Sequence, residues 1–235
     1  MLKIADAIDE RIGGRVMRWW DGQGAARVYA YDDETGTLLL ERATGSKNLL
    51  QMATSGDDDA ATRIVCETVG RLHVKRSAPT PQLLLSLPEF FISLDRAAAR
   101  EGGFMQACRA IKQGLLDSPR DPVVLHGDAH HSNILDFGER GWLAIDPKRV
   151  VGERYYDYVN VLCNPDLVSC VDAKRFARQV EVIVDYTGLE RNRLLKWVVA
   201  HAALSAAWFQ EDEDFDGASR GLEMARVALA CVSDR

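Results

Sequence analysis

The chain of 235 residues is long enough to bury a sizeable hydrophobic core, as one large domain or as a small lobe joined to a larger one. Its composition of 47% hydrophobic and 27% charged residues is ordinary for a soluble enzyme, and a formal net charge of -6 argues against a nucleic-acid surface as the main partner. The acidic balance suits a cationic or neutral small-molecule substrate.

The beginning of the chain has the pattern of a small unit that contains strands. A short apolar strand is predicted over residues 2–5, and a helix over 9–20 has apolar residues at helical spacing. Residues 26–31 and 36–41 are predicted to form an antiparallel hairpin across a polar turn. Residues 43–46 end this hairpin and are typical of a hinge.

From residue 57 onward the pattern is helical. Helices are predicted over residues 57–73, 89–101, 104–116, 173–187, 191–209 and 219–232. Residues 77–88 hold three of the seven prolines and are expected to form a linker or an extended surface crossing. The layout predicts an α+β fold with an N-terminal lobe over residues 1–44 and a mainly helical lobe over 45–235, with a ligand bound between them.

The residues 123–151, VVLHGDAHHSNILDFGERGWLAIDPKRVV, concentrate the chemistry of the chain. Four residues separate Asp128 from Asn133, which is the D-x-x-x-x-N spacing of a kinase catalytic loop, and Asp146 ends an apolar strand over 142–145. In phosphoryl transfer a carboxylate orients and deprotonates the attacking hydroxyl, while an amide oxygen and a second carboxylate hold Mg²⁺ on the nucleotide phosphates. The set therefore predicts a phosphoryl-transfer site.

The histidines of the same segment allow a second interpretation. His126, His130 and His131 lie beside an aspartate, a pattern that also occurs in zinc and iron sites, so a metal-dependent hydrolase is an alternative. No second cluster supplies further ligands, because His73 and His201 are predicted in helices with apolar neighbours. Neutral histidines that fill a catalytic loop are the favoured interpretation.

Cysteine usage and the first residues indicate a cytoplasmic protein. The five cysteines show no C-x-x-C pairing, so we expect reduced core residues and neither a disulfide frame nor a zinc site. Residues 1–12 carry acids early and lack an apolar signal region. The longest apolar run, 198–209, is too short to cross a bilayer, so we expect no membrane partner.

Several segments, spread over nearly the whole chain, resemble one family: RWWDGQGAARVYA, LLLERATG, HGDAHHSNIL, DFGERGWLAIDP, GERYYDY, NPDL and LSAAWF. The chain resembles the aminoglycoside phosphotransferase family, especially the branch of streptomycin 6-phosphotransferases and hydroxyurea phosphotransferases. The resemblance implies a protein-kinase-like two-lobed fold and the cofactors ATP and Mg²⁺. It implies O-phosphorylation of a small hydroxylated compound, with a streptomycin-type aminoglycoside first, as in antibiotic inactivation, and hydroxyurea as the alternative.

The resemblance also implies roles for single residues. Asp128 would be the catalytic aspartate that contacts the acceptor hydroxyl. Asn133 and Asp146 would bind the Mg²⁺ ions that bridge the ATP phosphates. His126 would be a structural member of the catalytic loop, and Asp157 would brace that loop from behind.

Four further positions match the nucleotide side of the family. Lys3 matches the strand lysine that contacts the ATP phosphates, and Glu10 matches the helix glutamate that pairs with it. Backbone groups from Glu41 to Ala43 would meet adenine in the hinge. Without the resemblance, Lys3 is equally well explained as a surface lysine and Glu10 as a solvated acid of a helix.

The substrate side has three candidate residues. The acidic run over 211–216, which begins with Glu211 and Asp212, could attract a guanidinium- or amine-bearing substrate, although such runs are commonly solvated loops. Trp208 ends the preceding helix, where it could stack against a substrate ring or pack in the core. Core packing is the favoured interpretation for Trp208.

The place of Lys3 in the chain departs from the family pattern. Family members have two more strands before the lysine strand, joined by a loop that covers the phosphates, whereas here the lysine is residue 3. We therefore expect a truncated N-terminal lobe and weak nucleotide affinity, and a catalytically impaired remnant is a further alternative. A lysine at a frayed chain end contributes little to electrostatic stabilisation, which depends on preorganisation.

Adding the two missing strands and their loop before residue 1 is accordingly expected to raise ATP turnover. The added loop would cover the phosphates, and the added strands would hold Lys3 in place. ADP release by the chain with and without the extension is the measurement. Full activity of the short chain would contradict the expectation.

Overall fold

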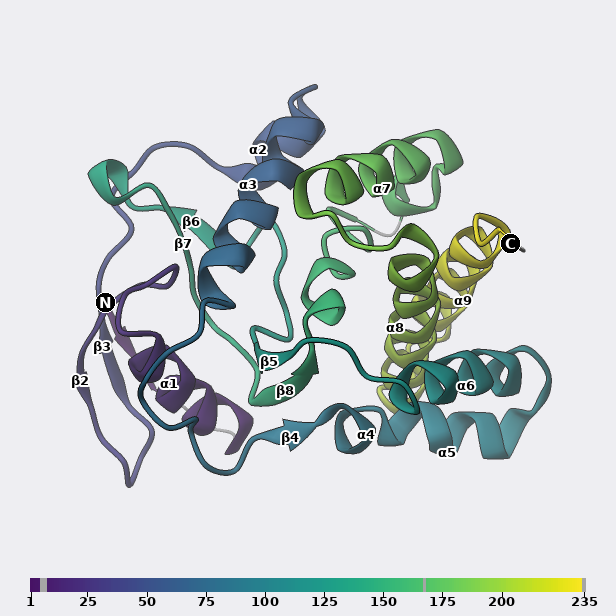
Figure 1. Cartoon of the computed structure of the whole chain (residues 1–235), viewed down its shortest axis with the longest axis horizontal. Coiled ribbons are helices and arrows are strands. Elements are labelled where there is room, and N and C mark those ends of the chain that lie inside the picture. The colour runs from purple at the N-terminus through teal and green to yellow at the C-terminus, as the bar shows by residue number, and fades with distance from the viewer. Residues whose placement is uncertain (5–7, 167, 234–235) are drawn as a thin grey trace.

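The computed structural model describes residues 1–4, 8–166 and 168–233, and it places a small sheet at one end of the molecule and helices at the other (Figure 1). The sheet is antiparallel, with strand order β1-β3-β2, and consists of β1 (Leu2–Lys3), β2 (Val28–Tyr31) and β3 (Leu38–Leu40). The predicted hairpin is confirmed, with a bulge between Val28 and Ala30. The first predicted strand ends at Lys3, and its last predicted residue, Ala5, lies outside the described residues.

Helix α1 (Ile8–Trp20) packs beside this sheet, and two glycines make the close packing possible. A Cβ added at Gly13 would lie 2.4 Å from the carbonyl oxygen of Pro147, and one added at Gly14 would lie 2.6 Å from a methyl group of Leu38. Because Pro147 directly follows Asp146, the missing side chain of Gly13 lets α1 touch the backbone beside a candidate metal ligand.

The helical part confirms the six predicted helices and adds two short ones. It consists of α2 (Leu49–Thr54), α3 (Asp58–Leu72), α4 (Leu87–Phe90), α5 (Ile92–Glu101), α6 (Gly103–Leu116), α7 (Ala173–Thr187), α8 (Arg191–Glu211) and α9 (Phe215–Ala230). Helix α8 runs between α6, α7 and α9 and is apolar around most of its circumference, as a helix buried on all sides must be.

Two boundaries differ from the prediction. The end of the proline-rich crossing forms β4 (Leu85–Ser86) and enters α4 through a capping box of Ser86 and Glu89. Helix α9 begins at Phe215 because Asp214 caps it, accepting a hydrogen bond from Gly217 N at 2.9 Å. The expected acidic loop is therefore a tight turn between two helices, and part of the run belongs to those helices.

Five short strands of the described residues, β4 among them, form the centre between the two parts. Strand β5 (Pro122–Leu125) pairs antiparallel with β8 (Val150–Glu153), and β8 also pairs with β4 in parallel. Strands β6 (Ile134–Asp136) and β7 (Trp142–Ala144) form a separate antiparallel hairpin. The backbone of Ala144 bonds to Gly24 and Ala26, which ties this hairpin to the segment between α1 and β2.

A buried ion pair joins the central sheet to α8. Arg193 of α8 donates to both carboxylate oxygens of Glu153, at 2.5 and 2.6 Å, and Trp197 Nε1 donates to the same carboxylate at 2.9 Å. A buried charge is tolerated only when partners of this kind surround it. The contact places α8, and the side chains farther along it, relative to the loop that follows β5.

The remaining expectations on composition concern cysteines and membrane segments. The five cysteines are free thiols; Cys66, Cys108 and Cys170 lie in the core as predicted, whereas Cys163 and Cys231 are only partly buried. Among the helices of the described residues, none is both long and apolar enough to cross a bilayer.

Replacing Gly13 by alanine is expected to destabilise the fold by about 1–3 kcal/mol, because the new Cβ would overlap the Pro147 carbonyl and the backbone would have to move. Gly70→Ala is the matched control, since Gly70 also lies in a helix and its added Cβ would meet no atom within 4 Å. This control is expected to stabilise the protein by about 0.5–1 kcal/mol. Urea unfolding of both variants is the measurement, and equal effects would contradict the close approach.

Candidate active site

The loop between β5 and β6 presents the carboxylate of Asp128, which is held from two sides. Asn160 Nδ2 donates to Asp128 Oδ1 at 2.6 Å, and Asn133 Nδ2 donates to Asp128 O at 2.9 Å and to Oδ2 at 3.3 Å. Lys148 Nζ lies 3.5 Å from Oδ2. The carboxylate is partly exposed, so it is oriented by its neighbours yet open to a ligand.

The β6–β7 hairpin brings Asn133 and Asp146 together although 12 residues separate them in the chain. Ile134 pairs with Ala144, and Ile145 N donates to Asn133 O at 2.9 Å, so both candidate ligands lie at the same end of the hairpin. Asp146 has a φ of 60°, a left-handed conformation that costs a residue with a side chain energy and recurs at functional sites.

The donor set at this hairpin end fits Mg²⁺, which prefers oxygen ligands. The side-chain nitrogen of Asn133 is used for Asp128, and this fixes the amide so that its oxygen is left for a cation. The Asp146 carboxylate supplies the second oxygen donor. A Mg²⁺ ion bound at this position would neutralise negative charge on nucleotide phosphates.

Lys3 contacts Asp146 and not Glu10. Its ammonium group forms an ion pair with the Asp146 carboxylate, across 143 residues of sequence. The expected pairing of Lys3 with Glu10 is thus not formed in the described part of the chain. Lys3 is also better fixed than expected, because β1 pairs with β3 and the Met1 amino group donates to Leu40 O at 2.6 Å.

Asp157 lies behind the catalytic loop, completely buried in the short helix η2 (Arg154–Tyr158). Its two carboxylate oxygens accept hydrogen bonds from the backbone amides of His126 and Gly127, both at 2.8 Å. His73 Nε2 contacts the same carboxylate at 2.7 Å. Hydrogen bonds of this kind to a buried charge hold the loop that carries Asp128 in one conformation.

His126 is buried and uses both ring nitrogens inside the loop. Its Nε2 contacts Ile145 O at 2.9 Å, its Nδ1 accepts from Asp128 N at 3.2 Å, and the ring stacks on Trp20. Burial lowers the pKa of His126, so the ring is neutral, and it has no nitrogen left for a metal. In the described part of the chain, no group of three or more metal-binding side chains is gathered, so the geometry gives the hydrolase alternative no support.

A cavity of about 510 Å³ opens beside Asp128 on the side of the helical part. Its lining includes three acids and one lysine: Asp9, Glu89, Asp128 and Lys148. Trp208 packs edge-to-face on Phe90, as favoured from the sequence, and it also lines the cavity; its stacking on a substrate ring stays a prediction. Arg149 forms an ion pair with Asp9, and Lys148 lies beside Asp128, so Glu89 is the lining acid without an ion-pair partner among the described residues and the cavity is only weakly acidic.

The two acidic candidates differ in their relation to this cavity. Glu211 reaches its rim, since Glu211 Oε2 accepts from Ser93 Oγ at 3.0 Å and Ser93 is part of the lining. Asp212 is exposed after the end of α8 and is not part of the lining. Both side chains are exposed, but the structure brings only Glu211 to the rim of the cavity.

The hinge candidates Glu41 and Ala43 follow β3. The Glu41 amide donates to Arg27 O at 2.8 Å, and the Glu41 carboxylate forms an ion pair with Arg140. In the described part of the chain, the backbone groups of Ala43 have no hydrogen-bond partner, and their contact with adenine stays a prediction.

Sequence reasoning missed three residues of the site: His73, Lys148 and Asn160. His73 ends α3, 84 residues from Asp157, and its apolar neighbours hide the contact. Asn160 follows η2 in an apolar stretch. The one sequence signal for its place near the Asp128 loop is that it lies about one helical turn after Asp157. Lys148 could have been inferred from the sequence, because it lies two residues after Asp146.

Comparison with known proteins shows which family the chain is similar to. A family model described as "Aminoglycoside/hydroxyurea antibiotic resistance kinase" matches residues 1–213. The streptomycin 3''-kinase of Klebsiella pneumoniae is 47% identical over 235 residues, with 98% of this chain and 87% of that protein covered. The hydroxyurea phosphotransferase of Kitasatospora aureofaciens is 30% identical over 238 residues, with 97% and 67% covered.

Solved structures with low sequence identity share the fold. A choline/ethanolamine kinase family protein from Mesorhizobium loti aligns with a TM-score of 0.72 at 17% identity, covering 97% of this chain and 81% of that chain. A thermostable mutant of aminoglycoside phosphotransferase APH(4)-Ia, in a ternary complex with ADP and hygromycin B, aligns with a TM-score of 0.66 at 10% identity, covering 99% and 87%. The predicted family resemblance and the protein-kinase-like α+β fold are confirmed.

Replacing His73 by leucine is expected to destabilise the protein by about 1–3 kcal/mol, because the buried Asp157 carboxylate would lose one of its three partners. His73→Gln is the matched variant, since its amide nitrogen can occupy the place of Nε2 and restore the bond. Urea unfolding and the hydrogen-exchange rates of the His126 and Gly127 amides are the measurements. Unchanged exchange in the leucine variant would show that His73 does not support the loop.

Proposed function

The chain belongs to the aminoglycoside/hydroxyurea antibiotic resistance kinase family, whose members are phosphotransferases, and we propose that it phosphorylates a hydroxyl group of a streptomycin-type aminoglycoside with ATP. The observation that carries the proposal is the carboxylate of Asp128, held by Asn133 and Asn160 at the wall of an acidic cavity of about 510 Å³. A catalytic base must reach the acceptor hydroxyl, and only a cavity that shares its carboxylate allows this.

In the proposed reaction, Asp128 orients the acceptor hydroxyl and takes its proton as the oxygen–phosphorus bond forms. The bond between the γ-phosphorus and its bridging oxygen breaks, and ADP leaves. Asn160 and Asn133 keep the carboxylate pointed at the acceptor, since both donate to it. Phosphoryl transfer needs little more from the protein than such positioning and the neutralisation of charge.

We assign the nucleotide to the other side of Asp128. Asn133 and Asp146 would hold Mg²⁺, and Lys3 would neutralise phosphate charge from its present place beside Asp146. The free backbone of Ala43, next to Glu41, would meet the base. In this assignment, residues 1–44 form the nucleotide-binding lobe and residues 45–235 the catalytic and substrate-binding lobe.

The acidic lining supports a cationic acceptor. Glu89 adds a carboxylate that has no ion-pair partner among the described residues, Asp9 adds one that a cationic group would share with Arg149, and Glu211 stands at the rim through Ser93. A guanidinium group forms paired hydrogen bonds with carboxylates, so a guanidinium-bearing aminocyclitol matches this wall better than a neutral compound does. Trp208 offers an apolar face to a sugar or cyclitol ring.

Hydroxyurea is the second candidate, because a relative of that activity is 30% identical to the chain. The cavity volume favours the larger acceptor. Hydroxyurea has five non-hydrogen atoms and would leave most of about 510 Å³ to water. It also carries no positive charge to match the acids.

With Mg²⁺ and ATP, streptomycin is expected to stimulate ADP release by the purified chain, and Asp128→Asn is expected to lower kcat by about 10²–10⁴-fold, because the general base is lost. Asp117→Asn is the matched control: it makes the same chemical change at an exposed helix end and should leave kcat unchanged. Mass spectrometry of the product shows the added phosphoryl group, and its NMR spectrum identifies the hydroxyl.

Other outcomes of this experiment have definite meanings. Turnover with hydroxyurea alone would support the second candidate. If neither compound is phosphorylated and neither ATP–Mg²⁺ nor streptomycin raises the melting temperature, the chain is an impaired remnant. Full activity of Asp128→Asn would remove Asp128 from the catalytic role.

A further inference from the structure

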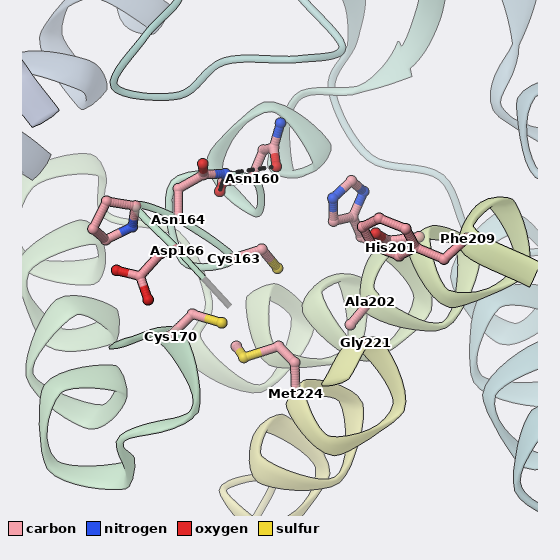
Figure 2. A pocket seen from close by; sticks show the side chains of 12 residues that line it. Asn160, Cys163, Asn164, Asp166, Cys170, His201, Ala202, Phe209, Gly221 and Met224 are labelled. Atoms are coloured by element: carbon pink, nitrogen blue, oxygen red, sulfur yellow. Dashed lines mark hydrogen bonds between the residues drawn. The ribbon is translucent and has the colours of Figure 1, made fainter. Parts of the chain in front are cut away.

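His201 of α8 lies where two cavities of the helical part meet. It lines the acceptor cavity of about 510 Å³, which it shares with Asp128, and also a second cavity of about 230 Å³. Figure 2 shows the second cavity, with the imidazole of His201 on one side and the hydrogen-bonded pair Asn160 and Asn164 on the other. The side chain is 6% exposed, so its environment is almost wholly built by the protein.

Tyr156 determines which nitrogen of this imidazole carries the proton. The Tyr156 hydroxyl lies 2.8 Å from His201 Nδ1, and this is its one hydrogen-bond partner among the described residues. Burial raises the pKa of Tyr156 well above its ordinary value, so the hydroxyl keeps its proton. Because that proton has no other acceptor among the described residues, the hydroxyl would donate a hydrogen bond to Nδ1, and in this arrangement Nδ1 carries no hydrogen of its own.

The proton of the neutral ring must then lie on Nε2. Burial lowers the pKa of His201 to about 4, with the charge of Asp128 opposing this only in part, so the ring is neutral near pH 7. A neutral imidazole has one N–H, and since Nδ1 accepts from Tyr156, that N–H is Nε2–H. Tyr156 and burial together hold His201 as a hydrogen-bond donor of fixed direction.

This donor has no partner within the described protein. Among the described residues, Nδ1 makes the one side-chain hydrogen bond of His201, and Nε2 makes none. Nε2 is still accessible, whereas both ring nitrogens of His131 are fully buried without a partner. An unused donor in an almost fully buried side chain costs about 1–3 kcal/mol unless a ligand or water satisfies it. Here it lies at the wall of the cavity that contains the catalytic carboxylate.

We propose that His201 positions the acceptor substrate by donating a hydrogen bond from Nε2–H to an oxygen atom of that substrate, where the two cavities meet. The proposal rests on the proposed function, because it takes the cavity beside Asp128 as the acceptor site. One part of a substrate with several rings would lie against Asp128 and Trp208, and another would extend toward Asn160 and Asn164.

In the proposed tautomer, His201 does not act as the catalytic base. The lone pair of its neutral ring lies on Nδ1, which the Tyr156 hydroxyl occupies, so the ring offers the cavity no site to accept a proton. His201 thus contributes binding and not proton transfer. A loss of binding common to the ground state and the transition state raises KM and leaves kcat nearly unchanged.

Steady-state kinetics with streptomycin as the probe tests this role. His201→Phe keeps a ring but no donor, and it is expected to raise the KM for streptomycin about tenfold, the size of one lost hydrogen bond, with kcat and the KM for ATP within about twofold. His201→Gln places an amide nitrogen near the former Nε2 and is expected to recover most of the affinity. Tyr156→Phe frees the ring to take either tautomer and should give an intermediate KM.

A second measurement observes the tautomer without any substrate. In the full chain labelled with ¹⁵N-histidine, the NMR signals of His201, assigned by their loss in His201→Gln, are expected to show a protonated Nε2 and an unprotonated Nδ1 at pH 7. Tyr156→Phe should shift the ring toward a mixture. The melting temperature of each variant shows whether a kinetic change comes from unfolding.

Each result decides between the proposals. If the unchanged protein phosphorylates streptomycin and His201→Phe has the same KM, the role of His201 is overturned and the proposed function stands. Equal losses in His201→Phe and His201→Gln overturn it too, because they show a packing effect. A protonated Nδ1 removes the donor. If the unchanged protein neither binds nor phosphorylates streptomycin, the proposed function fails and the inference falls with it.

Discussion

The buried carboxylate of Asp157 is the contact on which the active site depends. It accepts the backbone amides of His126 and Gly127 and the ring of His73, so one charge ties the end of β5, the start of the catalytic loop and the end of α3 together. A charge without contact to water requires such partners, and the loop can move only by giving them up. This constraint fixes the backbone that carries Asp128, and Asn133 and Asn160 then set the direction of its side chain.

Two further elements divide the space around Asp128. On one side, the β6–β7 hairpin sets Asn133 beside Asp146, and Gly13 lets α1 close on the backbone of Pro147. On the other side, α8 carries His201 and Trp208, and its place is fixed by the buried pair of Glu153 and Arg193. The proposed nucleotide and acceptor sites are therefore built by separate parts of the fold that meet at one carboxylate.

Features that depend on neighbouring residues could be predicted from the sequence, whereas contacts between residues far apart in the chain could not. The long helices, the β2–β3 hairpin and the catalytic spacing were visible because they depend on apolar periodicity and on neighbours within a few residues. Strand β4 was missed because two residues form a strand only when β8 lies beside them. Lys3 was expected to pair with Glu10, and the folded chain instead brings it to Asp146, 143 residues away.

The sequence by itself determined the family, through segments that resemble its members, and the helical content, through apolar periodicity. It also identified Asp128, Asn133 and Asp146 as candidates, through local spacing and residue type. The tertiary structure alone decided what surrounds them. The contact of His73 with Asp157, the Asn160 bond to Asp128 and the contact of Tyr156 with His201 join residues 84, 32 and 45 positions apart. Side-chain pairing over such separations depends on how helices pack, and periodicity along one chain carries no information about that packing.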